Sequence, residues 1–400
     1  MSPQGRPSRI VPVAITAHTL VCAAGTGRDA LSQALFDERS ALTFSDVPNS
    51  GTWWGRVQEL AALPVEWAAW DSRATRLALR GLMADGFNTS VAAAVARHGA
   101  ARVGLALGTS ASTIAVSEAA YARGRFEAPQ DHEGLNTLHG VTHFVQQRLG
   151  LQGPALTVST ACSSSAKVFA VAERWLRLQL VDAVVVAGVD ALGDSLLYGF
   201  NALGLLSNAP CRPFDAKRAG ISLGEAAGFA LLQRAEEAPS ALRLRGWGEA
   251  NDAHHMSSPH PEGLGAERAL TDALARAGVS AREIGCVNLH GTASARNDEV
   301  EAALVARHFA APTHASATKG VTGHTMGAAG IVESIVCLHA LQHGHCPGTA
   351  HTTAADAGLP DVFHTVFHTG AVRKNVRLAA NLSFGFGGNN SVLIFDKVAP

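Results

Sequence analysis

The sequence predicts an α/β protein made of two similar halves, and three observations lead to this fold class. Short apolar runs such as Ala183–Val189 are typical of buried strands, and they alternate with longer helical patterns. The order helix, strand, strand, buried helix, strand occurs once before about Glu236 and again after it. Each half also has one helical pattern that is apolar on nearly every side, as expected for a helix at the centre of a protein. We therefore expect sheets covered by helices on both faces, with the two buried helices side by side.

Composition narrows the class of protein. The chain has 400 residues, of which 47% are hydrophobic, 16% are charged and 40 are glycine, which suits a tightly packed enzyme. Its net charge is −1 and it has no basic block, so we expect no nucleic-acid partner. The N-terminal run from Ile10 to Ala24 superficially resembles a signal peptide, but Pro12 and His18 interrupt it, and it fits a strand better. No run is long enough to span a membrane. Six scattered cysteines without a CxxC pair favour a cytoplasmic protein without disulfides.

The strands and helices follow from the apolar patterns in chain order. In the half assigned to residues 1–236, we predict strands over Ile10–Cys22, Ala101–Leu107, Ala155–Val158 and Ala183–Val189, and helices over Asp29–Phe36, Trp67–Met83, Thr89–His98 and Ser163–Leu180. A segment from Ser117 to Gln147 is read as an excursion containing helices, and Phe44–Pro64 as irregular. In the half assigned to residues 237–400, we predict strands over Leu242–Ala250, Ile284–Leu289, Thr313–Thr318, Leu378–Leu382 and Ser391–Phe395, and helices over Leu264–Ala277 and Ala328–Leu341.

Cys162 stands at the turn between a buried strand and a buried helix, with small residues around it. A helix N-terminus favours negative charge, and a cysteine placed there can have its pKa lowered to about 3.5–7.5. Backbone N–H groups at such a turn can also hold an oxyanion. The alternative is an ordinary buried thiol, which is common in helical cores. The turn itself leaves both interpretations open.

Polar residues at strand ends of the second half favour catalysis. His290 follows the strand Ile284–Leu289 directly, while Lys319 and His324 follow Thr313–Thr318. A single histidine after a buried strand is usually structural. Two of them, each beside glycine and threonine, are more typical of an active site, because a neutral imidazole can donate to an oxyanion or act as acid or base near pH 7.

Six motifs in this order give the chain its resemblance to a family. They are ACSSSA, CRPFDAKRAGISLGEAAG, DAHHMSSPHPEG, HGTASARND, TKGVTGHTMGAAG and SFGFGGNN, and they extend over nearly the whole chain. The combination resembles the β-ketoacyl-(acyl carrier protein) synthases, which are condensing enzymes of the thiolase superfamily. The resemblance implies the thiolase fold, in which two pseudo-repeated halves make five layers in the order α-β-α-β-α. Two of the motifs look most like enzymes of bacterial aryl-polyene pathways.

The resemblance also implies a role for each residue of the site. Cys162 would accept the acyl chain as a thioester, and His290 and His324 would assist decarboxylation of malonyl-carrier and stabilise the enolate. The N–H groups of Cys162 and Phe386 would form the oxyanion hole, and Phe386 would gate the acyl pocket.

Four further residues would support this chemistry. Lys319 and Glu333 match a buried ion pair that orders the histidines. Thr292 and Ser294 match positions that hydrogen-bond the phosphopantetheine arm of the carrier. The resemblance implies no cofactor and no metal ion, and the three histidine pairs His254/His255, His343/His345 and His364/His368 have no supporting ligand motif.

The chain departs from the family pattern at a few positions. Ala219 and Ile221 stand where RDGF usually supplies Asp and Phe, the latter near the malonyl site. Asn389 replaces the usual Thr after GFGG, and Ser294 replaces a Thr but keeps the hydroxyl.

The expected partners are an acyl carrier protein and a second chain, either in a homodimer or in a heterodimer with a related ketosynthase or chain-length factor. Arg73, Arg76 and Arg80 share one helical face that could receive an acidic carrier, although a solvated face is the default. Three other functions remain open. The first is a non-catalytic partner that sets chain length, which commonly lacks the nucleophile. The others are a degradative thiolase, which has a second cysteine in its C-terminal glycine turn, and a cysteine peptidase.

Overall fold

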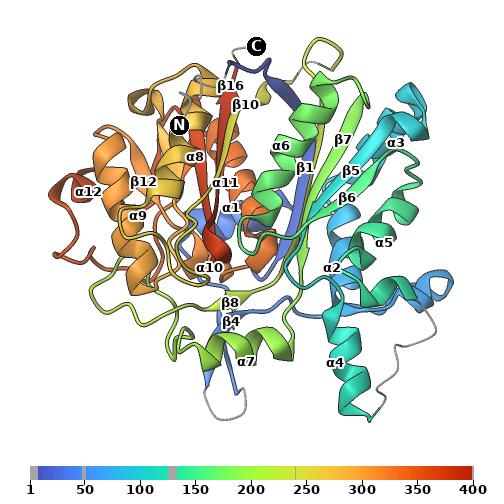
Figure 1. Ribbon diagram of the computed structural model, residues 1–400, viewed down its shortest axis with the longest axis horizontal. Helices are drawn as coiled ribbons and strands as arrows, with labels where there is room; N and C mark the ends of the chain where they lie inside the picture. The colour runs from blue at the N-terminus through green and yellow to red at the C-terminus, as the bar shows by residue number, and fades with distance from the viewer. Residues whose placement is uncertain (1–7, 47–50, 125–132, 239, 399–400) are drawn as a thin grey trace.

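One large mixed sheet forms the framework of the protein (Figure 1). The computed structural model describes residues 8–46, 51–124, 133–238 and 240–398. The strand path across the sheet is β12-β11-β15-β16-β10-β1-β9-β7-β5-β6, and the short strand β2 pairs with β1. In chain order the strands are β1 (Val13–Cys22), β2 (Gly25–Thr26), β5 (Val103–Gly108), β6 (Ala155–Val158), β7 (Ala183–Asp190), β9 (Ala226–Arg234), β10 (Leu242–Asn251), β11 (Cys286–Asn288), β12 (His314–Ser316), β15 (Leu378–Gly385) and β16 (Asn389–Lys397).

The sheet consists of two halves with the same strand order. From its centre outward, one half runs β1-β9-β7-β5-β6 and the other β10-β16-β15-β11-β12. In each half the first two pairings are antiparallel and the last two are parallel. The halves join where β1 pairs with β10, with Val13 opposite Leu244 and Ala14 opposite Arg243. The repeat predicted from the order of elements is therefore present in the strand topology.

The helices complete five layers, as predicted. Helices α6 (Ser164–Arg177) and α11 (Ala329–His343) lie side by side between the two halves of the sheet, and Phe169 and Ile331 belong to the core that they share. The outer face of the first half carries α2 (Arg73–Leu82), α3 (Phe87–His98) and α5 (Gly140–Leu149). The outer face of the second half carries α8 (Leu264–Ala277), α9 (Ala295–His308) and α12 (Asp361–Val366).

Small elements surround these layers. They are α1 (Arg28–Phe36), β3 (Thr43–Ser45), β4 (Thr52–Gly55), α4 (Ile114–Ala122), α7 (Asp194–Ala202), β8 (Leu223–Gly224), α10 (Lys319–Thr322), β13 (His345–Cys346) and β14 (Val372–Arg373). Short 3₁₀ turns lie between some of them. Among the described residues, no helix combines the length and the apolar character needed to cross a bilayer.

Several boundaries differ from the sequence prediction for physical reasons. The single helix expected over Trp67–Met83 is a 3₁₀ turn, Val65–Trp70, followed by α2, because a capping box between Ser72 and Thr75 starts a new helix. The region Phe44–Pro64, expected to be irregular, contains the end of β3 and all of β4, and its residues 47–50 lie outside the described residues. The excursion Ser117–Gln147 contains parts of α4 and α5, and its residues 125–132 lie outside the described residues.

Candidate active site

Cys162 lies on a tight turn between β6 and α6, as the sequence predicts. The preceding residue, Ala161, has φ +52°, a left-handed conformation that is unfavourable for a residue with a Cβ atom and often marks a functional turn. The side chain of Cys162 is buried, with 6% of the residue exposed, and it lines a pocket. The turn therefore presents the sulfur to an internal space.

The protonation state of Cys162 corrects one sequence-based expectation. Burial raises the pKa of its thiol to about 12, and the opposing effects of the Lys319 charge and of a hydrogen bond from the Phe386 N–H are smaller. Helix α6 begins only at Ser164, two residues after the cysteine. Burial therefore favours the neutral thiol over the thiolate that a position at the helix N-terminus suggested.

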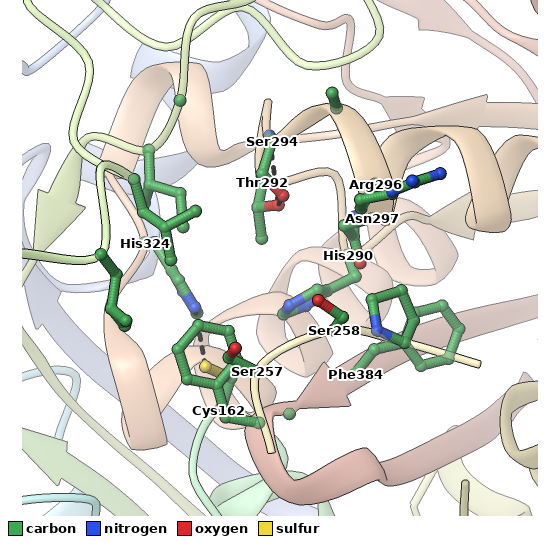
Figure 2. A pocket seen from close by; sticks show the side chains of 18 of the residues that line it. Cys162, Ser257, Ser258, His290, Thr292, Ser294, Arg296, Asn297, His324 and Phe384 are labelled. Carbon is green, nitrogen blue, oxygen red and sulfur yellow. Dashed lines mark hydrogen bonds between the residues drawn. The ribbon is translucent and has the colours of Figure 1, made fainter. Parts of the chain in front are cut away.

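Two histidines from the second half face this sulfur (Figure 2). His324 follows α10, and its Nε2 lies 2.9 Å from Cys162 Sγ. His290 follows β11, and its ring centre lies 5.3 Å from that of His324, with the rings at 88°. Burial is the main cause that holds the pKa of both histidines well below the usual value, with a further effect from Lys319. Both rings are consequently neutral at physiological pH.

A buried lysine fixes the tautomer of His290. Lys319 Nζ lies 3.3 Å from His290 Nδ1 and also donates to the backbone oxygen of His290 and to Glu333 Oε1. An ammonium group has only donors, so Nδ1 must accept and the ring proton is on Nε2, on the pocket side. Lys319 and Glu333 are both buried and lie behind the pocket, outside its lining.

The glycine turn Phe386–Gly388 forms the other wall beside the sulfur. The backbone N–H of Phe386 hydrogen-bonds Cys162 Sγ. Gly387 and Gly388 have φ +74° and +70°, which only glycine adopts readily. The Phe386 ring stacks on Phe200, with centroids 5.6 Å apart. The turn thus offers an N–H donor and an aromatic side chain to the same pocket.

The pocket has a volume of about 480 Å³ and connects these groups with the surface. Thr292 and Ser294 line it, with their hydroxyl oxygens 2.9 Å apart. Ala219 and Ile221, which depart from the family pattern, line it too. The structure therefore brings together at one pocket all the site residues predicted from sequence, with Lys319 and Glu333 in support.

Sequence reasoning missed a buried carboxylate that holds the His290 loop. Glu301 on α9 accepts the backbone N–H of His290 at 2.6 Å and that of Gly291 at 2.8 Å. Burial raises the pKa of Glu301 to about 8, against the opposing effect of these hydrogen bonds. Helix α9 was not predicted. The signal that could have indicated a buried carboxylate there is the acidic residue Glu301 among the apolar positions after HGTASARND.

Replacing Glu301 with glutamine is expected to flatten the pH dependence of stability. A carboxyl whose pKa is raised on folding, here from 4.5 to about 8, contributes stability that is full below the unfolded pKa and is lost as the pH rises towards 8. Between pH 4.5 and about 8, the free energy of unfolding should fall with rising pH more steeply in the wild type than in Glu301→Gln, by up to about 1.4 kcal/mol per pH unit. Chemical unfolding at several pH values measures the difference. Glu299→Gln, on the same helix but half-exposed, is the control, and equal slopes for wild type and Glu301→Gln would contradict the assignment.

The arginine face considered for carrier binding is largely occupied by contacts within the chain. Arg73 pairs with the buried Glu225, and Arg76 pairs with Asp71. Arg80 donates to the Thr26 hydroxyl at 2.7 Å. Glu225 also accepts the backbone N–H groups of Val57 and Leu192, so it braces several loops.

Comparisons with known proteins agree with this geometry. Residues 11–238 match the family model described as "Beta-ketoacyl synthase, N-terminal domain", and residues 242–353 match that of the C-terminal domain. A 3-oxoacyl-[acyl-carrier-protein] synthase 2 from Vibrio harveyi is 31% identical over 76% of this chain and 78% of its own length. A mitochondrial 3-oxoacyl-[acyl-carrier-protein] synthase from Arabidopsis thaliana is 35% identical over 64% of this chain.

The match covers 59% of the length of the Arabidopsis protein and 64% of that of the similarly related nodulation protein E of Rhizobium meliloti. Among solved structures, the chain superimposes with a TM-score of 0.89 and 34% identity, over 100% of both chains, on a chain of the ketosynthase ApeO in complex with its chain length factor ApeC from Xenorhabdus doucetiae. With family models matching both halves, the chain belongs to the β-ketoacyl synthase family.

Proposed function

We propose that this chain is a β-ketoacyl-(acyl carrier protein) synthase, an acyltransferase that catalyses decarboxylative Claisen condensation in fatty acid or polyketide chain elongation. The observation that carries the proposal is a thiol 2.9 Å from one neutral imidazole and opposite a second, at a pocket that reaches the surface. Such a set combines a nucleophile with two N–H donors for a developing oxyanion.

The first half-reaction loads the acyl chain on Cys162. The sulfur attacks the thioester carbonyl of an acyl-carrier, a carbon–sulfur bond forms, and the oxyanion is held by the N–H groups of Cys162 and Phe386. The bond to the pantetheine sulfur then breaks, and that sulfur takes the proton which the Cys162 thiol gives up. His324 Nε2, at 2.9 Å from Sγ, is placed to donate a hydrogen bond to the sulfur as the thiol loses this proton.

The second half-reaction makes the carbon–carbon bond. The carboxylate of malonyl-carrier leaves as CO₂, and its electron pair forms an enolate whose oxygen accepts hydrogen bonds from Nε2 of His290 and His324. The enolate carbon attacks the acyl carbonyl, and the Cys162 sulfur leaves as a thiolate and takes a proton from water. Lys319 keeps His290 in the required tautomer, and Glu333 balances the lysine charge.

Release of CO₂ drives the reaction, so we propose no cofactor and no metal ion. The donor atoms of Cys162, His290 and His324 lie within 4.8 Å of one another, a set that could hold zinc. The Lys319 ammonium, 3.3 Å from His290 Nδ1, would repel a cation there and favours the thiol chemistry.

The proposed partners are an acyl carrier protein and a second ketosynthase-like chain. The pantetheine arm would run past the hydroxyls of Thr292 and Ser294 in the pocket. Strand β6 is the last strand of the sheet path and its residues are half-buried, so a second chain could pair there. The solved complex of ApeO with its chain length factor supports a heterodimer with a related chain, and a homodimer stays the other possibility. The motifs DAHHMSSPHPEG and HGTASARND support an aryl-polyene pathway as the narrower setting. We also propose a cytoplasmic location, which fits six cysteines that form no disulfide. For the division of the chain, we propose residues 1–236 and 237–400 as the two halves.

The alternative function is that of a chain-length-factor-like subunit without its own activity. The purified chain, supplied alone with acyl-carrier and malonyl-carrier, should form β-ketoacyl-carrier and release CO₂ in equal amounts. Mass spectrometry of the carrier measures the product. Activity that appears only after a second ketosynthase is added, and that persists when this chain carries Cys162→Ala, would instead show an accessory role.

A further inference from the structure

A lysine on the nucleophile helix is linked to the glycine turn across the active site. Lys167, on α6, donates from Nζ to Asn389 Oδ1 at 3.0 Å. Asn389 Nδ2 in turn donates to the backbone oxygen of Phe386 at 3.4 Å. These three residues connect the helix that follows Cys162 with the turn whose N–H faces the sulfur. Asn389 is also the position where this chain departs from the family's usual threonine.

The hydrogen bonds of Gly387 and Gly388 come from the same half of the protein as the turn. Met256 O accepts the N–H of Gly387 at 2.7 Å, and Asn251 Nδ2 donates to Gly387 O at 2.8 Å. The backbone N–H of Asp252 donates to Gly388 O at 2.9 Å. These bonds shape the turn, but they do not set its distance from the first half, which carries Cys162.

The backbones of the two halves approach closely beside the turn. A Cβ atom at Gly385 would lie 2.8 Å from Thr160 O and 3.1 Å from Ser163 N, so a side chain there would push the two turns apart. The position of Phe386 relative to Cys162 therefore depends on this backbone contact and on the stacking of the Phe386 ring on Phe200. A hydrogen-bonded side-chain link between α6 and the turn would add a directional constraint on the position of the turn relative to Cys162.

We propose that Lys167 is a positioning residue, which holds the Phe386 N–H in register with the Cys162 sulfur through the side chain of Asn389. The inference rests on the proposed function, because an N–H donor in this place matters only if an oxyanion forms at the acyl carbonyl. Lys167 is half-buried, and burial lowers its pKa against the opposing charge of Glu249, so its ammonium is held there at a cost in hydration. The fixed position of the turn is the functional consequence of keeping this ammonium half-buried.

The test compares two reactions of the same sulfur. Lys167→Met keeps the aliphatic length and removes the donor. We expect the single-turnover rate of acyl transfer from a saturating acyl-carrier to Cys162 to fall about tenfold, because a displaced oxyanion donor loses part of its effect. Alkylation of Cys162 by iodoacetamide forms no oxyanion, so its rate should change less than about twofold. The acyl-carrier concentration at half-saturation should stay the same.

Two further variants sharpen the result. Asn389→Ala should lower acyl transfer as much as Lys167→Met, and the double variant should lose no more than either single one, because both act through one link. Lys374→Met is the matched control: Lys374 is also half-buried and donates to the backbone oxygens of Gly285 and Pro312, away from the pocket, and its loss should leave both rates unchanged.

Three outcomes would overturn the inference. The first is an unchanged rate of acyl transfer in Lys167→Met. The second is an equal fall in the rates of acyl transfer and of alkylation. The third is a change only in the acyl-carrier concentration at half-saturation. Failure of the wild type to load from any acyl-carrier would instead refute the proposed function, so the two failures can be told apart.

Discussion

Cys162→Ala is expected to lower condensation by about 10⁴-fold or more, since nucleophile removal has effects of this size in other covalent enzymes. The variant has no atom to hold the acyl chain between the two half-reactions. It should still decarboxylate malonyl-carrier, because the enolate is held by His290 and His324 and not by the sulfur. Release of CO₂ and formation of β-ketoacyl-carrier, measured in parallel, separate the two activities.

The controls for Cys162→Ala are another cysteine and a histidine. Cys22→Ala, at a buried thiol outside the pocket lining, should keep condensation. His290→Ala should lose decarboxylation, which Cys162→Ala keeps. Normal condensation by Cys162→Ala would remove the covalent intermediate from the mechanism.

Lys319→Met is expected to destabilise the protein by about 3–5 kcal/mol, because it leaves the Glu333 carboxylate buried without its partner. Burial raises the pKa of Glu333 to about 7 even with Lys319 present. Without the lysine this pKa rises further, so the carboxylate costs more at pH 8 than at pH 6, where it is mostly protonated. Chemical unfolding at both pH values should show the larger loss at pH 8.

The double variant Lys319→Met/Glu333→Gln distinguishes stability from catalysis. Neutralising Glu333 should restore much of the lost stability and remove its pH dependence. It should not restore condensation, because His290 Nδ1 would still lack the donor that fixes its tautomer. Full activity of a stable double variant would show that the buried pair serves the fold alone.

The sequence alone predicted the candidate site best where an apolar strand pattern ends directly before a reactive residue. Strand β6 matches its predicted bounds, and the turn at Cys162 and the histidines after β11 and α10 follow from short apolar runs that stop at polar residues. Helix α8 and its C-cap at Gly278 also match the prediction, because periodicity and a left-handed glycine are both local. Local patterns of this kind predicted the layers and placed the main reactive groups.

Properties that depend on packing could not be predicted in this way. Strand β9 was missed because alanine and glycine fill much of it, and it is a strand through its pairing with β1 and β7. Nothing local indicates that β1 pairs with β10 and joins the halves. Burial raises the pKa of Cys162, and this burial comes from packing and not from the strand-to-helix turn that the sequence does show. Glu301 likewise acquires its role only where α9 packs behind the His290 loop.

The central claim is that the Cys162 sulfur, facing two neutral imidazoles, is the atom that accepts the acyl chain. Intact-mass spectrometry after incubation with a panel of acyl-carriers tests it most directly. We expect a mass increase of one acyl group for at least one carrier, located by peptide mapping on Cys162 and absent in Cys162→Ala. An acyl group on another residue, or none with any carrier, would contradict the account.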